Sequence, residues 1–269
     1  MISSNKITGN FYVIDEFCKE FENVTHKHRL VEDTGIKARR RTSTLSDSEV
    51  MAIMVLFHYK QFRNLKHFYL YYVRVHMKNE FPKTVSYNRF VELQQKPVLP
   101  SALFLKTRCS GGCTGISFID STPLRVCHNK REKQHKVFKG IAAKGQCSLG
   151  RFFGFKLHLI INDKGEILDF MLAQGNVDDR KPLRTTTSIN VFLVKYMGIK
   201  VTSARIMLRK RALIETVNDE LKNQCQVEHT RHRSFENFIT NLLSGSVSYS
   251  FFDKKPTLNL EIIDKRLTA

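Results

Sequence analysis

The sequence predicts a two-part α/β protein of the α+β kind, in which a helical N-terminal region precedes a mixed-sheet core. Before residue 97, apolar residues recur at helical spacing. From residue 116 onward, short apolar runs and period-2 alternation indicate strands, and helical spacing then returns. The 269 residues are enough to bury a substantial core in one large domain or two modest ones.

Three helices are predicted in the N-terminal region. Ser46 and Glu49 have capping-box spacing, which starts a helix that reaches about Tyr59. A second helix is predicted over residues 65–77, and a third follows Ser86. Many basic residues flank these helices, so we interpret the region as DNA-binding, the alternative being a plain helical bundle with a solvated basic face.

A change in composition near residues 96–100 separates the two parts. The sequence Lys-Pro-Val-Leu-Pro there is interpreted as an extended connector. The predicted domains are therefore residues 1–100 and 101–269. After the connector we expect a strand over residues 116–119 that ends on Asp120. A hairpin follows, with strands over residues 153–161 and 167–172, and its first strand has one mostly polar face. Two helices are expected after it, over residues 208–223 and 234–243.

Composition limits the classes of function. Hydrophobic residues at 42% and charged residues at 26% indicate a globular, soluble chain. The longest apolar run, Met51–Phe57, is too short to cross a membrane, and residues 1–6 lack a secretory signal, so we expect a cytoplasmic protein with no membrane partner. The net charge of +19 favours nucleic acid as the partner, with general solubilising charge as the alternative.

The six cysteines show no paired spacing typical of metal or redox motifs. Reduced structural thiols are the natural interpretation for a protein inside the cell. A zinc arrangement of Cys109, Cys113, Cys127 and His128 is the less favoured alternative.

Two acidic residues are candidates for metal-dependent chemistry. Asp120 follows a buried strand, a common place for a metal ligand, although an Asx turn or helix cap is the simpler explanation for this residue taken alone. Glu215 lies on a basic predicted helix, with Asp219 one turn further on, and ordinary surface ion pairs are its simplest explanation. Between Asp179 and Glu215 the chain has nine Lys or Arg residues and no acid.

Six sequence blocks together make the function more specific. They resemble the DDE transposases of bacterial insertion sequences, in particular the 982 family. The resemblance is close over about residues 116–182 and 207–260. The blocks are Phe118–Leu124, His135–Gly140, Phe153–Leu159, Gly175–Arg180, Arg211–Asn218 and Glu228–Ser234.

The resemblance implies an RNase H-like catalytic core whose three acids hold two Mg²⁺ or Mn²⁺ ions. Asp120 corresponds to the first acid and Glu215 to the third. The implied partners are DNA, as terminal inverted repeats and target, and a second copy of the chain bound with it. The basic residues expected to contact DNA are Lys136, Lys139, Lys156, Arg211, Lys222, Arg231 and Arg233.

The second acid is where this sequence departs from the family. The family carries it in a Gly-Asp-Lys-Gly-Tyr block, which is absent here, and Asp178 and Asp179 belong to the preceding motif, at the wrong place on the sheet. We expect the core to be disrupted over about residues 183–206 and to lack one strand and an adjacent helix. Residues 193–202 can be encoded so that another reading frame gives the missing block, so a frameshift is one hypothesis for its loss.

A transposase impaired in catalysis is therefore the leading interpretation. One alternative is an active enzyme that recruits Asp178, Asp179 or Asp219 as its third ligand. The other is a non-catalytic DNA-binding relic, or an inhibitor of the intact transposase.

Overall fold

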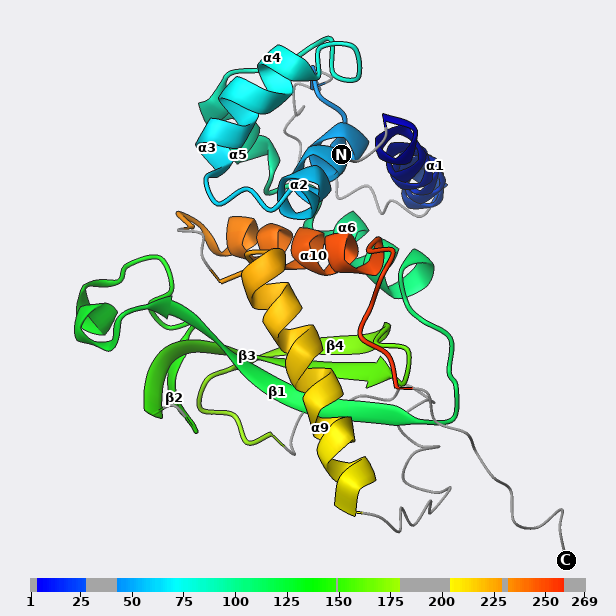
Figure 1. The fold of residues 1–269 in the computed structure, drawn as a ribbon. Helices are drawn as coiled ribbons and strands as arrows, with labels where there is room; N and C mark the ends of the chain where they lie inside the picture. The colour runs from blue at the N-terminus through cyan, green and yellow to red at the C-terminus, as the bar shows by residue number, and fades with distance from the viewer. Residues whose placement is uncertain (1–3, 28–42, 149, 180–203, 229–231, 259–269) are drawn as a thin grey trace, which may run out of the picture. The chain divides into compact units, whose positions relative to one another are not determined.

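The structure is a computed structural model of the chain, and it describes residues 4–27, 43–148, 150–179, 204–228 and 232–258 (Figure 1). The chain forms two compact units. One, the helical unit, is Met1–Arg108 with Asn223–Phe251, and the other, the sheet unit, is Cys109–Lys222 with Phe252–Ala269. The predicted α+β fold is confirmed. The helical unit extends past residue 100 and takes in the helix that begins after Ser234.

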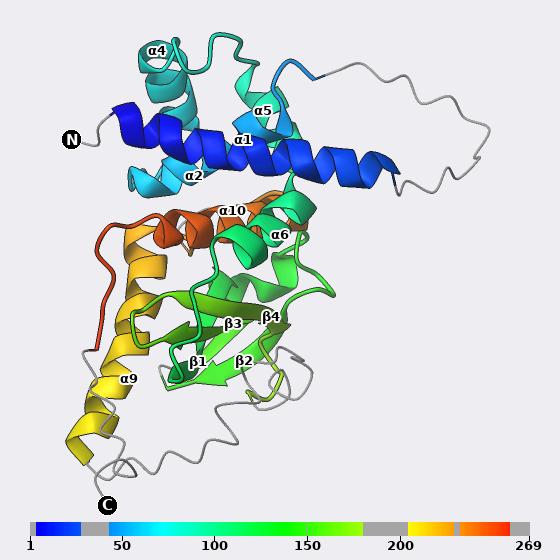
Figure 2. The same cartoon turned by 90° about the vertical axis from the view of Figure 1, so that its right-hand side faces the viewer.

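The helical unit is built around one buried helix. Its elements are α1 (Ser4–Lys27), α2 (Asp47–Tyr59), α3 (Leu65–His67), a π-helical turn η1 (Phe68–Val73), α4 (Arg74–His76), α5 (Tyr87–Leu93), α6 (Val98–Arg108) and α10 (Phe235–Ser250). Every residue of α2 from Val50 to His58 is buried, so this helix is apolar on all sides and forms the centre of the unit. Figure 2 shows α1 running along α2, and α10 lying beside α6, as their packing contacts require.

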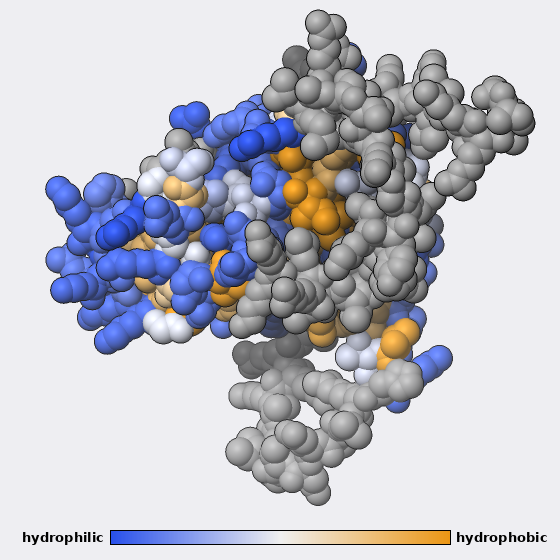
Figure 3. Space-filling view, turned by 90° about the horizontal axis from the view of Figure 1, so that it is seen from below, coloured by the Kyte–Doolittle hydropathy of each residue, from blue (hydrophilic) through white to orange (hydrophobic). Residues whose placement is uncertain are grey.

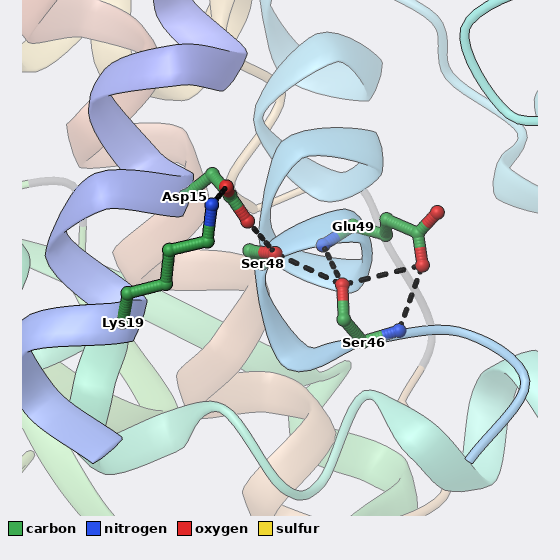
Figure 4. A network of polar contacts seen from close by, with 5 residues as sticks. All are labelled: Asp15, Lys19, Ser46, Ser48 and Glu49. Atoms are coloured by element: carbon green, nitrogen blue, oxygen red, sulfur yellow. Dashed lines mark hydrogen bonds and ion pairs between the residues drawn. The ribbon is translucent and has the colours of Figure 1, made fainter. Parts of the chain in front are cut away.

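The predicted capping box starts α2 (Figure 4). The Oγ of Ser46 accepts a hydrogen bond from the Glu49 N–H at 3.1 Å, and the Ser46 N–H donates to the Glu49 carboxylate at 2.8 Å. These two bonds satisfy backbone groups that a helix start leaves without partners. Ser48 then donates to the Asp15 carboxylate of α1 at 2.7 Å, so the same turn ties α2 to α1.

The helix α10 approaches its neighbours closely because it carries small residues. Ser244, Gly245, Ser246 and Ser248 are all buried within it. A Cβ added at Gly245 would lie 2.3 Å from a methyl group of Val227, which is closer than any side chain tolerates. Glycine at this position therefore allows the segment before α10 to pack against it.

Two expectations for the helical unit were incomplete or wrong. Residues 96–100 do not form an extended connector, because α6 begins at Val98 and Pro100 lies in its first turn. A proline is tolerated there since the first backbone N–H groups of a helix have no partner within the helix. The predicted second helix runs from Leu65 to His76, but its middle is π-helical. The helix α1 was not predicted at all.

In the sheet unit, one central strand organises the sheet. Its strands are β1 (Ser117–Cys127), β2 (Ala143–Cys147), β3 (Gly150–Asn162) and β4 (Ile167–Gln174). The strand β3 pairs with β1 along one edge and with β2 and then β4 along the other. All these pairings are antiparallel, so the described residues do not include the parallel pairing that a mixed sheet contains.

The predicted hairpin is confirmed, but two details of the strands differ from expectation. The strand β1 does not end at Asp120 but continues to Cys127, through Pro123. Residues 152–162 of β3 are buried on both faces, and Lys156 alone among them is partly exposed. The expected polar face is therefore not a solvent face, because a central strand can be covered on both sides. The segment expected to be disrupted, residues 183–206, lies almost wholly outside the described residues.

The predicted helix over residues 208–223 is confirmed as α9 (Ala204–Asp219), which continues as a π-helical turn, η3 (Glu220–Gln224). α9 packs against β1 and crosses the sheet (Figure 1). This packing brings the side chains of one helix face to the strand that carries Asp120.

Replacing Ser46 by Ala should lower the free energy of unfolding by about 1 kcal/mol, because it removes the cap of the buried helix. Urea unfolding of the two proteins measures the difference. Thr44→Ala, an exposed change two residues earlier, should alter stability by less than about 0.5 kcal/mol. Equal effects of the two substitutions would show that the cap does not stabilise the unit.

The stability of the helical unit should fall as the pH drops below neutrality. The buried imidazole of His58 hydrogen bonds to the Cys225 carbonyl, and burial lowers its pKa to about 4. An unfolded histidine titrates near pH 6.5, so the stability that neutral His58 contributes is present above about pH 6.5 and is lost as the pH falls towards 4. Burial, followed by the charge of His58, also lowers the pKa of His232 to about 4.

Urea unfolding between pH 7 and pH 5 tests this expectation. The wild-type protein should lose stability over this range, and His58→Gln should weaken the dependence without abolishing it, because His232 remains. A pH profile identical in the two proteins would contradict the assignment.

Candidate functional site

A pocket of about 440 Å³ lies in the sheet unit where β1 meets α9. Its lining includes the candidate acids Asp120 and Glu215, which lie 95 positions apart in the sequence. Three cationic side chains and four carboxylates line it, so the pocket is slightly acidic although the chain carries a net charge of +19. The charged residues are Lys156, Arg211, Lys222, Asp120, Asp179, Glu215 and Asp219.

Asp120 is held in the pocket by a helix residue. Its Oδ2 accepts a hydrogen bond from the Nδ2 of Asn218 on α9 at 3.0 Å. Burial raises the pKa of the Asp120 carboxyl, the negative charge of Glu215 raises it further, and the Ser121 backbone N–H and Arg211 oppose the rise. A partly buried carboxylate near another acid is costly to ionise alone, so a cation at this place would relieve the cost.

Glu215 comes from the same helix face, three residues before Asn218. Its carboxylate accepts a bond from the Nε of Arg211 at 2.9 Å, and both side chains are well exposed. An exposed i,i+4 pair of this kind is worth about 0.3–0.5 kcal/mol, so it holds Glu215 only weakly.

Asp179 lines the same pocket, although the sequence analysis placed it elsewhere on the sheet. Its carboxylate pairs with Lys156 at 2.9 Å, and the ammonium of Lys156 also donates to the Val177 carbonyl at 3.1 Å. Burial alone would raise the pKa of Asp179, but hydrogen bonds from the side chains of Lys156 and Ser121 outweigh it and lower the pKa. Asp179 is thus a stabilised anion with partners of its own.

The register of the sheet separates Asp179 from Asp120. Successive residues of a strand point to opposite faces, so Asp120 and Ser121 point away from each other. Lys156 is opposite Pro123 in the pairing of β1 with β3, so it shares a face with Ser121. The pocket therefore draws Asp120 from one face of the sheet and the partners of Asp179 from the other.

Of the residues expected to contact DNA, three line the pocket. Lys156 pairs with Asp179, Arg211 pairs with Glu215, and the Lys222 ammonium donates to the Pro123 carbonyl at 2.6 Å. Lys136 and Lys139 are exposed in the segment before β2. Figure 1 shows this segment at the left, and the surface at the left of Figure 3 is mostly hydrophilic.

The remaining candidates lie elsewhere. Arg233 is exposed in the helical unit, not in the pocket, and Arg231 lies outside the described residues. The alternative zinc site finds no support, because the described residues hold no group of three or more His, Cys, Asp or Glu side chains suited to a metal ion. In the same part of the chain, no helix is long and apolar enough to cross a membrane.

The pocket can hold a divalent cation only if its residues supply oxygen ligands. Asp120 and Glu215 supply two carboxylates, the hard ligands that Mg²⁺ and Mn²⁺ prefer. The Oδ1 of Asn218 is buried and has no hydrogen-bond partner among the described residues. These three residues supply oxygen donors of the kind a divalent cation prefers, although only two of them are carboxylates. Asn218 could not be predicted from the sequence, because only its position beside Asp120 marks it out.

Comparison with known proteins gives one family match. Residues 110–196 and 192–235 match a protein-family model described as a transposase DDE domain. The match supports a DDE transposase, a class of protein that acts on DNA and generally uses divalent metal ions. No curated protein and no solved structure matches the chain significantly.

Replacing Lys156 by Met should raise the pKa of Asp179, because the change removes the cation that stabilises its carboxylate. Carboxyl titration followed by ¹³C NMR measures the pKa directly. Lys144→Met, which removes an exposed lysine paired with Glu132, should leave Asp179 unaffected. An unchanged Asp179 pKa in Lys156→Met would show that the ion pair does not form in solution.

Proposed function

We propose that the protein is a DNA transposase of an insertion sequence, of the 982 family, that binds terminal-repeat DNA and has an impaired site for metal-dependent strand cleavage and transfer. The observation that carries the proposal is the meeting of Asp120 and Glu215 in one pocket with phosphate-binding cations. The match to a transposase DDE domain supports the same class. A dimer on DNA is part of the proposal by resemblance to the family.

Asp120, Glu215 and Asn218 would hold the divalent cation. When bound, such an ion activates water or a DNA 3′-hydroxyl and stabilises the oxygen that leaves phosphorus. The chain's own residues would position the DNA. Arg211 on α9 and Lys222 on η3 offer positive charge to phosphate groups beside the pocket. The long pairing of β1 with β3 keeps Asp120 at a fixed place.

Three observations support impairment. The block that carries the family's second acid is absent from the sequence. Asp179, one of the two further acids that line the pocket beside Asp120 and Glu215, is committed to Lys156 and Ser121. The family match is divided in two within the acid-free stretch, and its parts overlap at residues 192–196. Two acids that lack a third would place and neutralise the metal ions poorly, and positioning is most of what such a site contributes.

An active enzyme is a second candidate, favoured by one observation: Asp179 lines the same pocket as Asp120. It would require Asp179 to leave Lys156. A non-catalytic DNA-binding relic, or an inhibitor of intact transposase, is the remaining alternative.

Binding and cleavage of terminal-repeat DNA test the proposal together. We expect a gel shift that weakens steeply as salt rises, since each phosphate contact releases counterions. Arg211→Ala should weaken binding and lower the salt slope by about one, whereas Lys164→Ala, which removes an exposed lysine of the hairpin turn outside the pocket, should change neither. Strand cleavage with Mg²⁺ should not exceed that of Asp120→Ala.

Each contrary result has a distinct meaning. Cleavage abolished by both Asp120→Ala and Asp179→Asn would establish the active enzyme and overturn impairment. Lack of a shift at low salt would reject the DNA-binding function. A shift without any cleavage, combined with inhibition of an intact transposase, would favour the inhibitor.

A further inference from the structure

The side chain of Asn218 is used at only one of its two ends. It is 6% exposed, and its Nδ2 donates to Asp120 at 3.0 Å. The Oδ1 at its other end has no hydrogen-bond partner among the described residues, although its burial removes it from water. An amide oxygen left in this state costs free energy, which a ligand for that side chain would recover.

The orientation of this amide depends on what lies next to it. An ionised Asp120 has only acceptor oxygens, so it must face the Nδ2 group of Asn218 and not the Oδ1 atom. A half-turn of the amide about its last side-chain bond exchanges the two atoms with almost no change in shape. The turn would place two oxygens about 3.0 Å apart, which is unfavourable unless a cation lies between them.

That spacing is an ordinary hydrogen-bond distance, and it is also compatible with two neighbouring ligands of magnesium. Ligands of Mg²⁺ lie about 2.1 Å from the ion at right angles, so neighbouring ligand oxygens are about 3.0 Å apart. The Asp120–Asn218 distance is 3.0 Å. Glu215 lies one helical turn before Asn218 and lines the same pocket, so a further oxygen ligand comes from the same helix face.

We propose that Asn218 is a ligand of the divalent cation in this protein: its amide turns over when the ion binds, and its Oδ1 joins the carboxylates of Asp120 and Glu215. In the metal-free protein the same amide holds Asp120 through its N–H group. The inference rests on the proposed function, because it assumes that Asp120 and Glu215 bind a metal ion. Since an amide oxygen is neutral, the site binds the ion more weakly than three carboxylates would.

A ligand and a simple hydrogen-bond donor predict opposite effects when Asn218 is removed. A donor that holds Asp120 only in the metal-free state competes with the ion, so its removal would tighten binding. Removal of a ligand weakens binding. Removal of a donor that holds Asp120 both with and without the ion would also weaken binding. In that case the N–H group of Asn218 would remain hydrogen-bonded to Asp120 after the ion binds.

Titration of the full chain with Mn²⁺, followed by electron paramagnetic resonance, measures the affinity. Asn218→Leu should weaken Mn²⁺ binding at least about tenfold, and Asn218→Asp should tighten it by a similar factor because it adds a charge to the ligand. Thr216→Asp adds the same charge to another face of α9 and should change binding by less than about twofold. In the wild type, addition of Mg²⁺ should shift the side-chain ¹⁵N amide signal of Asn218 as its bond to Asp120 breaks.

The outcomes separate this inference from the proposed function. Wild-type protein that binds no Mn²⁺ would overturn the inference and the assignment of a metal ion to Asp120 and Glu215, whereas a salt-sensitive gel shift by the same protein would leave the DNA-binding function standing. Wild-type binding that Asp120→Asn abolishes but Asn218→Leu leaves unchanged or tightens would overturn the inference alone. So would an Asn218 amide that stays hydrogen-bonded to Asp120 after Mg²⁺ is added. If Asn218→Leu does not fold, weaker binding by Asn218→Asp than by the wild type would have the same consequence.

Discussion

The central position of β3 is the constraint on which the site depends. Because β1 pairs with one edge of β3 over nearly its whole length, Asp120 is fixed opposite Leu159 and Lys156 opposite Pro123. A shift of one residue in this register would exchange the two faces and turn Asp120 away from α9. A Cβ added at Gly154 of β3 would lie 2.0 Å from the Leu124 carbonyl, so glycine is what allows the two strands to approach where the pairing becomes irregular.

Within this frame, the charges of the pocket are arranged in local pairs. Lys156 stabilises Asp179, Arg211 holds Glu215, and Asn218 occupies Asp120 with a neutral donor. Of the two ion pairs, Lys156–Asp179 has the more buried member, since the side chain of Lys156 is 12% exposed. The exposed Arg211–Glu215 pair is easily broken by salt or phosphate. Of these three acids, Asp179 is thus the one most firmly engaged.

Local signals in the sequence predicted much of this fold. The caps at Ser46, Ser86 and Ser234 lie where helices begin, and the hairpin after residue 150 has its predicted turn. Pro100 misled the interpretation of the connector, because the start of a helix tolerates a proline. Long-range pairing could not be predicted: the sequence identified Asp120 and Glu215 by motif, but only tertiary contact reveals Asn218 and the partners of Asp179.

The order of the units along the chain has a consequence for damaged copies of the gene. The chain forms most of the helical unit, then the sheet unit, then returns for α10 before ending in the sheet unit. A nonsense mutation just after codon 222 would therefore keep every residue that lines the pocket, yet it would remove α10, the helix that packs on α2 and α6. Misfolding and proteolysis would limit the amount of such a fragment, although the gene would still encode every residue that lines the pocket.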